Sequence, residues 1–145
     1  MTIYTIGFTK RTAQDFFETL NGAGIRRLID VRLNNTSQLA AFTKKDDLRY
    51  LLKAITGADY VHEPLLAPTD ELLSAYKKAH GSWETYEHGF LELVKSRHIE
   101  STVDRGLFEE STVLLCSEFE PHHCHRRLVA EYLSRAWSGV QIQHL

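Results

Sequence analysis

Short apolar runs alternate with longer amphipathic stretches along the whole chain. Runs rich in β-branched and other apolar residues predict strands over residues 3–8, 27–32, 58–63, 112–117 and 140–145. Apolar residues spaced three and four positions apart predict helices over residues 12–20, 45–55 and 69–96, and from Pro121 onward. Because strand and helix alternate, we expect an α/β fold with a parallel sheet of about five strands and helices on both faces.

Turn and cap residues support these boundaries. Thr12-Ala-Gln-Asp15 resembles a capping box with Asp in place of Glu, and Gly57 closes the helix that begins near Lys45. The helical stretch over residues 69–96 is interrupted near Gly81 and Ser82. The segment from residue 64 to residue 107 is longer than a simple crossover, so we expect a helical insertion before the fourth strand, either a lid or an extended crossover.

The length of 145 residues, without a repeat or linker, predicts a single domain over residues 1–145. We expect a Rossmann-like three-layer sandwich with strand order 3-2-1-4-5. Its switch point would then lie between the first and fourth strands, where such folds bind ligands. The fifth strand would lie exposed at the sheet edge, which would permit an oligomer.

The composition is ordinary for a globular protein, with 43% hydrophobic and 25% charged residues. A net charge of −2 gives no global basic field, so wholesale attraction to nucleic acid or to a membrane surface is not expected. No apolar run reaches transmembrane length, and the N-terminal residues do not resemble a signal peptide. Two cysteines do not make a disulfide scaffold, so we expect a cytoplasmic protein.

Both cysteines, three histidines and two adjacent arginines follow the fourth strand in one block, Cys116-Ser-Glu118-Phe-Glu-Pro121-His-His-Cys124-His125-Arg126-Arg127. If Pro121 takes the first helical position, Cys124 lies in the first turn of that helix. The helix dipole and the neighbouring cations would then lower its pKa and make it a reactive thiolate. Cys116, at a strand end, is expected to be buried and inert.

The carboxyl ends of parallel strands meet at one sheet edge, which would bring several polar groups of this chain together. A helix N-terminus beside basic side chains suits a phosphate or another anion. We expect Lys10, Arg32 and Arg126 to hold the anion. Asn34 and Asn35, which begin a polar run that extends to Gln38, would orient the ligand. The reacting group would be Cys124 or Glu118, and Cys116 and His125 would also line the site.

Two other interpretations concern the same region. For Asp30, inside the second strand, a salt bridge to Arg32 or Arg126 is favoured over a role as catalytic base. The histidine and cysteine side chains after the fourth strand would suit a soft metal such as zinc. However, the Cys-x7-Cys-His spacing is not a usual zinc spacing, and the adjacent Cys124 and His125 would strain to share one ion. We therefore predict no metal site.

Known motifs exclude some reactions. Phosphotyrosine-type phosphatases need Cys-x5-Arg, but the sixth residue after Cys116 is His122, and Arg126 follows Cys124 too closely. The chain has no GxGxxG, Walker or GxSxG motif, so the sequence predicts no particular cofactor.

Several short motifs resemble the family known as domain of unknown function 488. They are Thr5-Ile6-Gly7, Asp30-Val31-Arg32, Ser37 with Phe42, and Leu115-Cys116-Ser117-Glu118 with Cys124-His125-Arg126-Arg127. The chain departs from that pattern where it reads Phe8-Thr9-Lys10 in place of His-Ser, and Leu65-Leu66-Ala67 in place of Leu-Gly-Gly. The resemblance implies a compact α/β domain of bacterial type and no particular reaction.

Two functional hypotheses follow from these observations. The first is a cytoplasmic enzyme that acts on a phosphate-bearing ligand, either a nucleotide or a nucleic-acid end. The second is a non-catalytic binding or regulatory module, in which the Cys-His-Arg block forms a structural network or senses redox state or a metal. The redox version requires Cys116 and Cys124 to approach within bonding distance.

Overall fold

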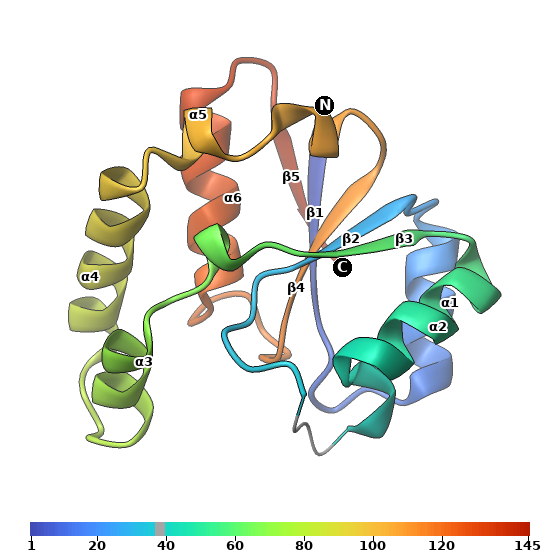
Figure 1. The fold of residues 1–145 in the computed structure, drawn as a ribbon, viewed down its shortest axis with the longest axis horizontal. Helices are drawn as coiled ribbons and strands as arrows, with labels where there is room; N and C mark the ends of the chain where they lie inside the picture. The colour runs from blue at the N-terminus through green and yellow to red at the C-terminus, as the bar shows by residue number, and fades with distance from the viewer. Residues whose placement is uncertain (37–39) are drawn as a thin grey trace.

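The computed structural model describes residues 1–36 and 40–145 and shows a parallel sheet covered by helices on both faces (Figure 1). Every strand pairing in this described part is parallel. The strands are β1 (Thr2–Gly7), β2 (Arg27–Asp30), β3 (Asp59–His62), β4 (Thr112–Cys116) and β5 (Gln141–His144). The predicted α/β, Rossmann-like three-layer sandwich is therefore confirmed.

The strand order is β3-β2-β4-β1-β5, so the expected order 3-2-1-4-5 is wrong. Strand β4 lies between β1 and β2, and Thr112 aligns with Ile3 on one side and Arg27 on the other. All five residues of β4 are buried, as is typical of a central strand with helices on both faces.

This order moves the switch point of the sheet. The chain leaves β2 toward β3 and leaves β4 toward β5, in opposite directions and over opposite faces. The switch point therefore lies between β2 and β4, and not between the first and fourth strands as the sequence predicts. The residues after Asp30 and after Cys116 flank it.

One face of the sheet is covered by α1 (Ala13–Gly22) and α2 (Lys45–Thr56) (Figure 1). The expected cap of α1 is present, because Thr12 Oγ1 accepts a hydrogen bond of 3.0 Å from the backbone N–H of Asp15. Helix α2 ends, as predicted, at Gly57, whose φ of 75° is left-handed.

The other face is covered by α3 (Asp70–Lys77), α4 (Trp83–Ser96), α5 (Ile99–Thr102) and α6 (His125–Ala136) (Figure 1). The first three form the predicted helical insertion before β4. The break between α3 and α4 lies at the predicted place, and Ser82 caps α4. Short 3₁₀ helices occur at Ala41–Thr43, Pro64–Leu66 and Arg105–Phe108. Within the described residues, no helix is long and apolar enough to cross a membrane.

Helix α6 begins at His125, four residues later than the sequence predicts. Cys124 is the N-cap, with extended backbone angles of φ −139° and ψ 136°. Two arginines in the first turn of α6 donate hydrogen bonds to carbonyl oxygens of the preceding loop. Arg126 donates to Glu118 and Phe119, and Arg127 donates to His122. These bonds stabilise residues 118–122 as a loop, because their carbonyl oxygens are used by side chains.

Strand β1 passes the loop after β4 so closely that only glycine fits at residue 7. A Cβ atom on Gly7 would lie 1.6 Å from the Glu118 carbonyl oxygen and 3.1 Å from Arg126 Nη1. We expect Gly7→Ala to lower the free energy of unfolding by about 3 kcal/mol, since the overlap is with backbone that must move. Urea unfolding measures this change.

A second glycine supplies the matched control for that substitution. Gly22 is exposed at the end of α1, and a methyl group added to it would meet nothing within 4 Å. Gly22→Ala should change stability by less than about 1 kcal/mol, in the stabilising direction, because alanine is the better helix former. Equal stabilities of the two variants would contradict the close approach at Gly7.

Candidate functional site

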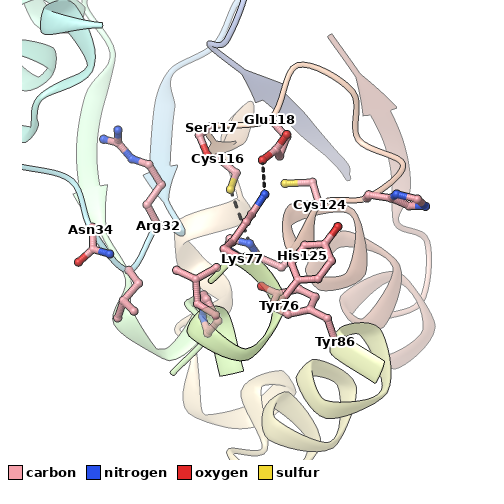
Figure 2. Close-up of a pocket in the computed structure, with 14 residues that line it drawn as sticks. Arg32, Asn34, Tyr76, Lys77, Tyr86, Cys116, Ser117, Glu118, Cys124 and His125 are labelled. Carbon is pink, nitrogen blue, oxygen red and sulfur yellow. Dashed lines mark hydrogen bonds and ion pairs between the residues drawn. The ribbon is translucent and has the colours of Figure 1, made fainter. Parts of the chain in front are cut away.

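A cavity of about 200 Å³ opens at the switch point between the carboxyl ends of β2 and β4 (Figure 2). Helix α3 and the N-terminus of α6 close its sides. Its lining combines sulfur, imidazole and aromatic groups with one ion pair, and consists of Arg32, Leu33, Asn34, Pro68, Leu73, Tyr76, Lys77, Tyr86, Cys116, Ser117, Glu118, His123, Cys124 and His125. Ligands of α/β proteins bind at this position of the fold.

Cys116 and His125 face each other at this cavity (Figure 2). Cys116 is the last residue of β4, His125 is the first residue of α6, and Cys116 Sγ lies 3.6 Å from His125 Nδ1. The other ring nitrogen, Nε2, lies 2.7 Å from the Val31 carbonyl oxygen. Because a carbonyl only accepts, Nε2 carries the proton, and in the neutral ring the lone pair of Nδ1 is directed at sulfur.

Both cysteines are buried, as the sequence predicts for Cys116, and their pKa values shift in opposite directions. The Cys124 thiol stabilises the Cys116 thiolate by a hydrogen bond and, with the Ser117 backbone N–H and the Arg126 charge, lowers the pKa of Cys116. Burial and the neighbouring Cys116 sulfur raise the pKa of Cys124 well above its ordinary value. The lowered pKa expected for Cys124 is not found, because the residue is a buried N-cap beside Cys116, and Cys116 is the thiol that the surroundings favour as thiolate.

Arg126 holds the loop between β4 and α6. Its side chain is fully buried, and its Nη1 and Nη2 atoms donate to the carbonyl oxygens of Glu118 at 2.6 Å and Phe119 at 3.1 Å. Within the described chain Arg126 forms no ion pair with a carboxylate and does not line the cavity. The guanidinium of Arg126 therefore does not reach the cavity, whereas the sequence predicts that it holds an anion.

Arg32 and Asn35 belong to a buried network around Asp30. Arg32 donates from Nε and Nη2 to the two Asp30 carboxylate oxygens, each at 2.9 Å, which confirms the expected salt bridge. Asn35 Nδ2 contacts Asp30 and the Tyr60 hydroxyl. Arg32 borders the cavity, but its guanidinium points away from Cys116 (Figure 2). Both side chains are therefore engaged in holding the end of β2.

The remaining predicted residues are divided between the cavity and the surface. Lys10 is exposed, with a φ of 64°, and does not line the cavity. Asn34 does line it, and so does Glu118, whose carboxylate pairs with Lys77 at 2.8 Å. Ser37 and Gln38, at the end of the expected polar run, lie outside the described residues.

Sequence reasoning missed the contribution of the helical insertion to the site. Tyr76 and Lys77 come from α3 and Tyr86 from α4, and the Tyr76 and Tyr86 rings pack with their centroids 4.8 Å apart. Tyr86 is buried in the apolar cluster of α4 and α6 and also lines the cavity. Helical periodicity alone does not show which apolar residues face a cavity.

Cys116, Cys124 and His125 also bring their ligand atoms together. One ligand atom from each residue lies within 4.8 Å of the other two, and all three residues are buried. The adjacent residues Cys124 and His125 differ in backbone conformation, since Cys124 is an extended N-cap and His125 is the first residue of α6. His122 and His123 do not join them; their rings stack on each other at 4.5 Å, and His123 also stacks on Trp83.

Fold and site together define a Rossmann-like α/β protein with a cysteine–histidine cluster at its switch point. A family model described as domain of unknown function DUF488 matches residues 12–133, and the chain belongs to that family. This span contains β4, the following loop and every residue that lines the cavity. No curated protein and no solved structure gives a significant match.

The role of Arg126 as a loop clamp predicts a large loss of stability on its removal. We expect Arg126→Met to lower the free energy of unfolding by about 3 kcal/mol, because the Glu118 and Phe119 carbonyl groups lose charged donors from a buried side chain. Arg135→Met is the matched control on the same helix. Arg135 is exposed and lies 3.8 Å from Glu131, and its loss should cost about 1 kcal/mol or less. Similar urea midpoints for the two variants would contradict the clamp.

Proposed function

We propose that the protein is a cysteine-dependent enzyme in which Cys116 attacks a small molecule and His125 exchanges the proton. The observation that carries this proposal is the 3.6 Å contact between Cys116 Sγ and His125 Nδ1 at the cavity, with the imidazole oriented by the Val31 carbonyl. A nucleophile, a base within reach and a third group that orients the base form the usual arrangement for covalent catalysis.

The proposed reaction begins with transfer of the thiol proton from Cys116 Sγ to His125 Nδ1. The resulting imidazolium is stabilised by the 2.7 Å hydrogen bond from Nε2 to Val31. The thiolate then forms a bond between sulfur and the electrophilic atom of the substrate. The bond from that atom to its leaving group breaks, and the leaving group takes the proton from Nδ1. The positive end of the α6 dipole and the Arg126 charge favour the thiolate.

The shape and charge of the cavity favour a compact substrate with little net charge. About 200 Å³ accommodates one small group beside the Tyr76 and Tyr86 rings rather than a whole nucleotide. The ammonium of Lys77 is balanced by the Glu118 carboxylate at 2.8 Å. A substrate would therefore place its reacting carbon beside Cys116 and a polar end at this ion pair, where Lys77 and Glu118 would position it.

The phosphate-bearing ligand expected from the sequence is less well supported by this arrangement. Arg126 is engaged by carbonyl groups and Arg32 by Asp30, and Lys10 lies away from the cavity. A phosphate would have to displace Glu118 from Lys77 without the help of either buried arginine.

A dithiol switch is the second candidate function. It is favoured by the short separation of the Cys116 and Cys124 sulfur atoms, which lie within 4.8 Å of each other as free thiols. Oxidation by a peroxide or disulfide would join them, with the loss of two protons and two electrons from the pair. In that case neither thiol need react with a small-molecule electrophile.

Alkylation by iodoacetamide at neutral pH, mapped by mass spectrometry, tests the nucleophile. Cys116 should react at least about tenfold faster than Cys124, because its surroundings favour the thiolate and those of Cys124 do not. His125→Gln should slow the reaction of Cys116 by about tenfold or more, since the proton acceptor is lost. His122→Gln, at an exposed histidine of the same loop, should leave the rate unchanged.

The same experiment separates the two candidates. Slow alkylation of both thiols, unaffected by His125→Gln, would contradict the enzyme proposal. Rapid joint loss of both thiols on mild oxidation, without fast alkylation of Cys116, would favour the dithiol switch.

A further inference from the structure

We propose that Cys116, Cys124 and His125 bind a single zinc ion and leave its fourth coordination position open to the cavity. The inference does not depend on the proposed reaction, although both use Cys116. Within the described part of the chain, this is the group of cysteine, histidine and carboxylate side chains that meets the geometry of a metal site. Two sulfurs and one imidazole are ligands that favour Zn²⁺ over hard cations such as Mg²⁺.

The distances fit a tetrahedral zinc site before any ion is bound. With Zn–S near 2.3 Å and Zn–N near 2.0 Å, a tetrahedral sulfur–nitrogen edge measures roughly 3.5 Å. The observed distance from Cys116 Sγ to His125 Nδ1 is 3.6 Å. Because the Cys124 sulfur lies within 4.8 Å of both atoms, a shift of about 1.3 Å or less would complete the three-ligand face.

His125 has the outer hydrogen bond that zinc-binding histidines usually make. Its Nε2 donates to the Val31 carbonyl at 2.7 Å, which fixes the tautomer and directs the Nδ1 lone pair toward Cys116 Sγ. The ring is also held from the side by Phe90, with centroids 5.2 Å apart. The imidazole is therefore already oriented for a metal on Nδ1.

The scaffold holds these ligands on regular structure rather than on a free loop. Cys116 ends β4, Cys124 caps α6 and His125 begins that helix, while Arg126 fixes the intervening loop. All three side chains also line the cavity, so the missing fourth ligand would come from water or a small molecule in it. Three protein ligands with an open position are typical of catalytic rather than structural zinc sites.

Binding is balanced without any change of oxidation state. Zn²⁺ replaces the protons of the two thiols, which pass to solvent, and forms bonds to both sulfurs and to neutral His125 Nδ1. Because both sulfurs are then bonded to the ion, the zinc-loaded protein should resist alkylation at both cysteines.

Cobalt(II) titration of the reduced, metal-free protein tests the site directly. One equivalent of Co²⁺ should produce thiolate-to-cobalt charge-transfer absorption and tetrahedral d–d bands, and one equivalent of Zn²⁺ should remove them. Cys116→Ser, Cys124→Ser and His125→Gln should each weaken Zn²⁺ binding by at least about 100-fold, the upper end of the loss for an outer-shell partner. His122→Gln should bind as the unmodified protein does. Circular dichroism verifies that each variant is folded.

A measurement on the unmodified protein makes the test independent of how well the variants fold. Zn²⁺ should protect Cys116 and Cys124 from iodoacetamide, and at 100 times its dissociation constant it should stabilise the fold by about 2.7 kcal/mol. Absence of cobalt charge-transfer bands, or zinc binding that all three ligand variants retain, would overturn the metal site. If Cys116 is alkylated fast but no metal binds, the metal site is overturned and the proposed nucleophile stands. If metal binds but the metal-free thiols are alkylated slowly, the proposed nucleophile is overturned and the metal site stands.

Discussion

The buried guanidinium of Arg126 is the contact on which the site depends. It holds the carbonyls of Glu118 and Phe119, and so it fixes the path of the chain from the end of β4 to the start of α6. Gly7 leaves the space that this path requires, since any side chain there would overlap the Glu118 carbonyl. Because the loop is held in this way, Cys116 and His125 are brought together although eight residues separate them. The spacing of the Cys-x-Glu and Cys-His-Arg motifs thus has a structural explanation.

The two buried arginines of the sheet edge differ in how their charges are balanced. The charge of Arg32 is balanced by the Asp30 carboxylate, which also accepts a hydrogen bond of 2.6 Å from the Tyr60 hydroxyl. Arg126 has carbonyl acceptors, which carry no net charge, and among the described residues no carboxylate pairs with it. A buried cation in this position favours an anion nearby, and its charge adds to the hydrogen bond from Cys124 in lowering the pKa of Cys116. The clamp that shapes the loop therefore also supplies part of the electrostatics of the site.

The elements of this fold could be predicted from the sequence, but their arrangement could not. Local periodicity and caps such as Thr12 and Gly57 decide where strands and helices lie, so most boundaries agree within one or two residues. Strand order depends on contacts between distant parts of the chain. Strand β4 lies at the centre and all its residues are buried, but a short apolar run in the sequence does not show whether a strand is central or flanking. The start of α6 depends likewise on side-chain bonds from Arg126 to a distant loop carbonyl. The position of Lys77 at the cavity depends on the packing of α3, a helix of the insertion before β4.

The same geometry supports both thiol chemistry and metal binding because both require an imidazole lone pair directed at sulfur. Val31 provides that condition because its carbonyl oxygen accepts a hydrogen bond from Nε2–H of His125, whether a proton or a metal ion lies between Nδ1 and Cys116. Cys124 distinguishes the two. As a hydrogen-bond donor with a raised pKa it stabilises one thiolate, but as a second ligand it must itself lose its proton. The protonation of its sulfur would therefore distinguish the proposed nucleophile from the proposed metal centre.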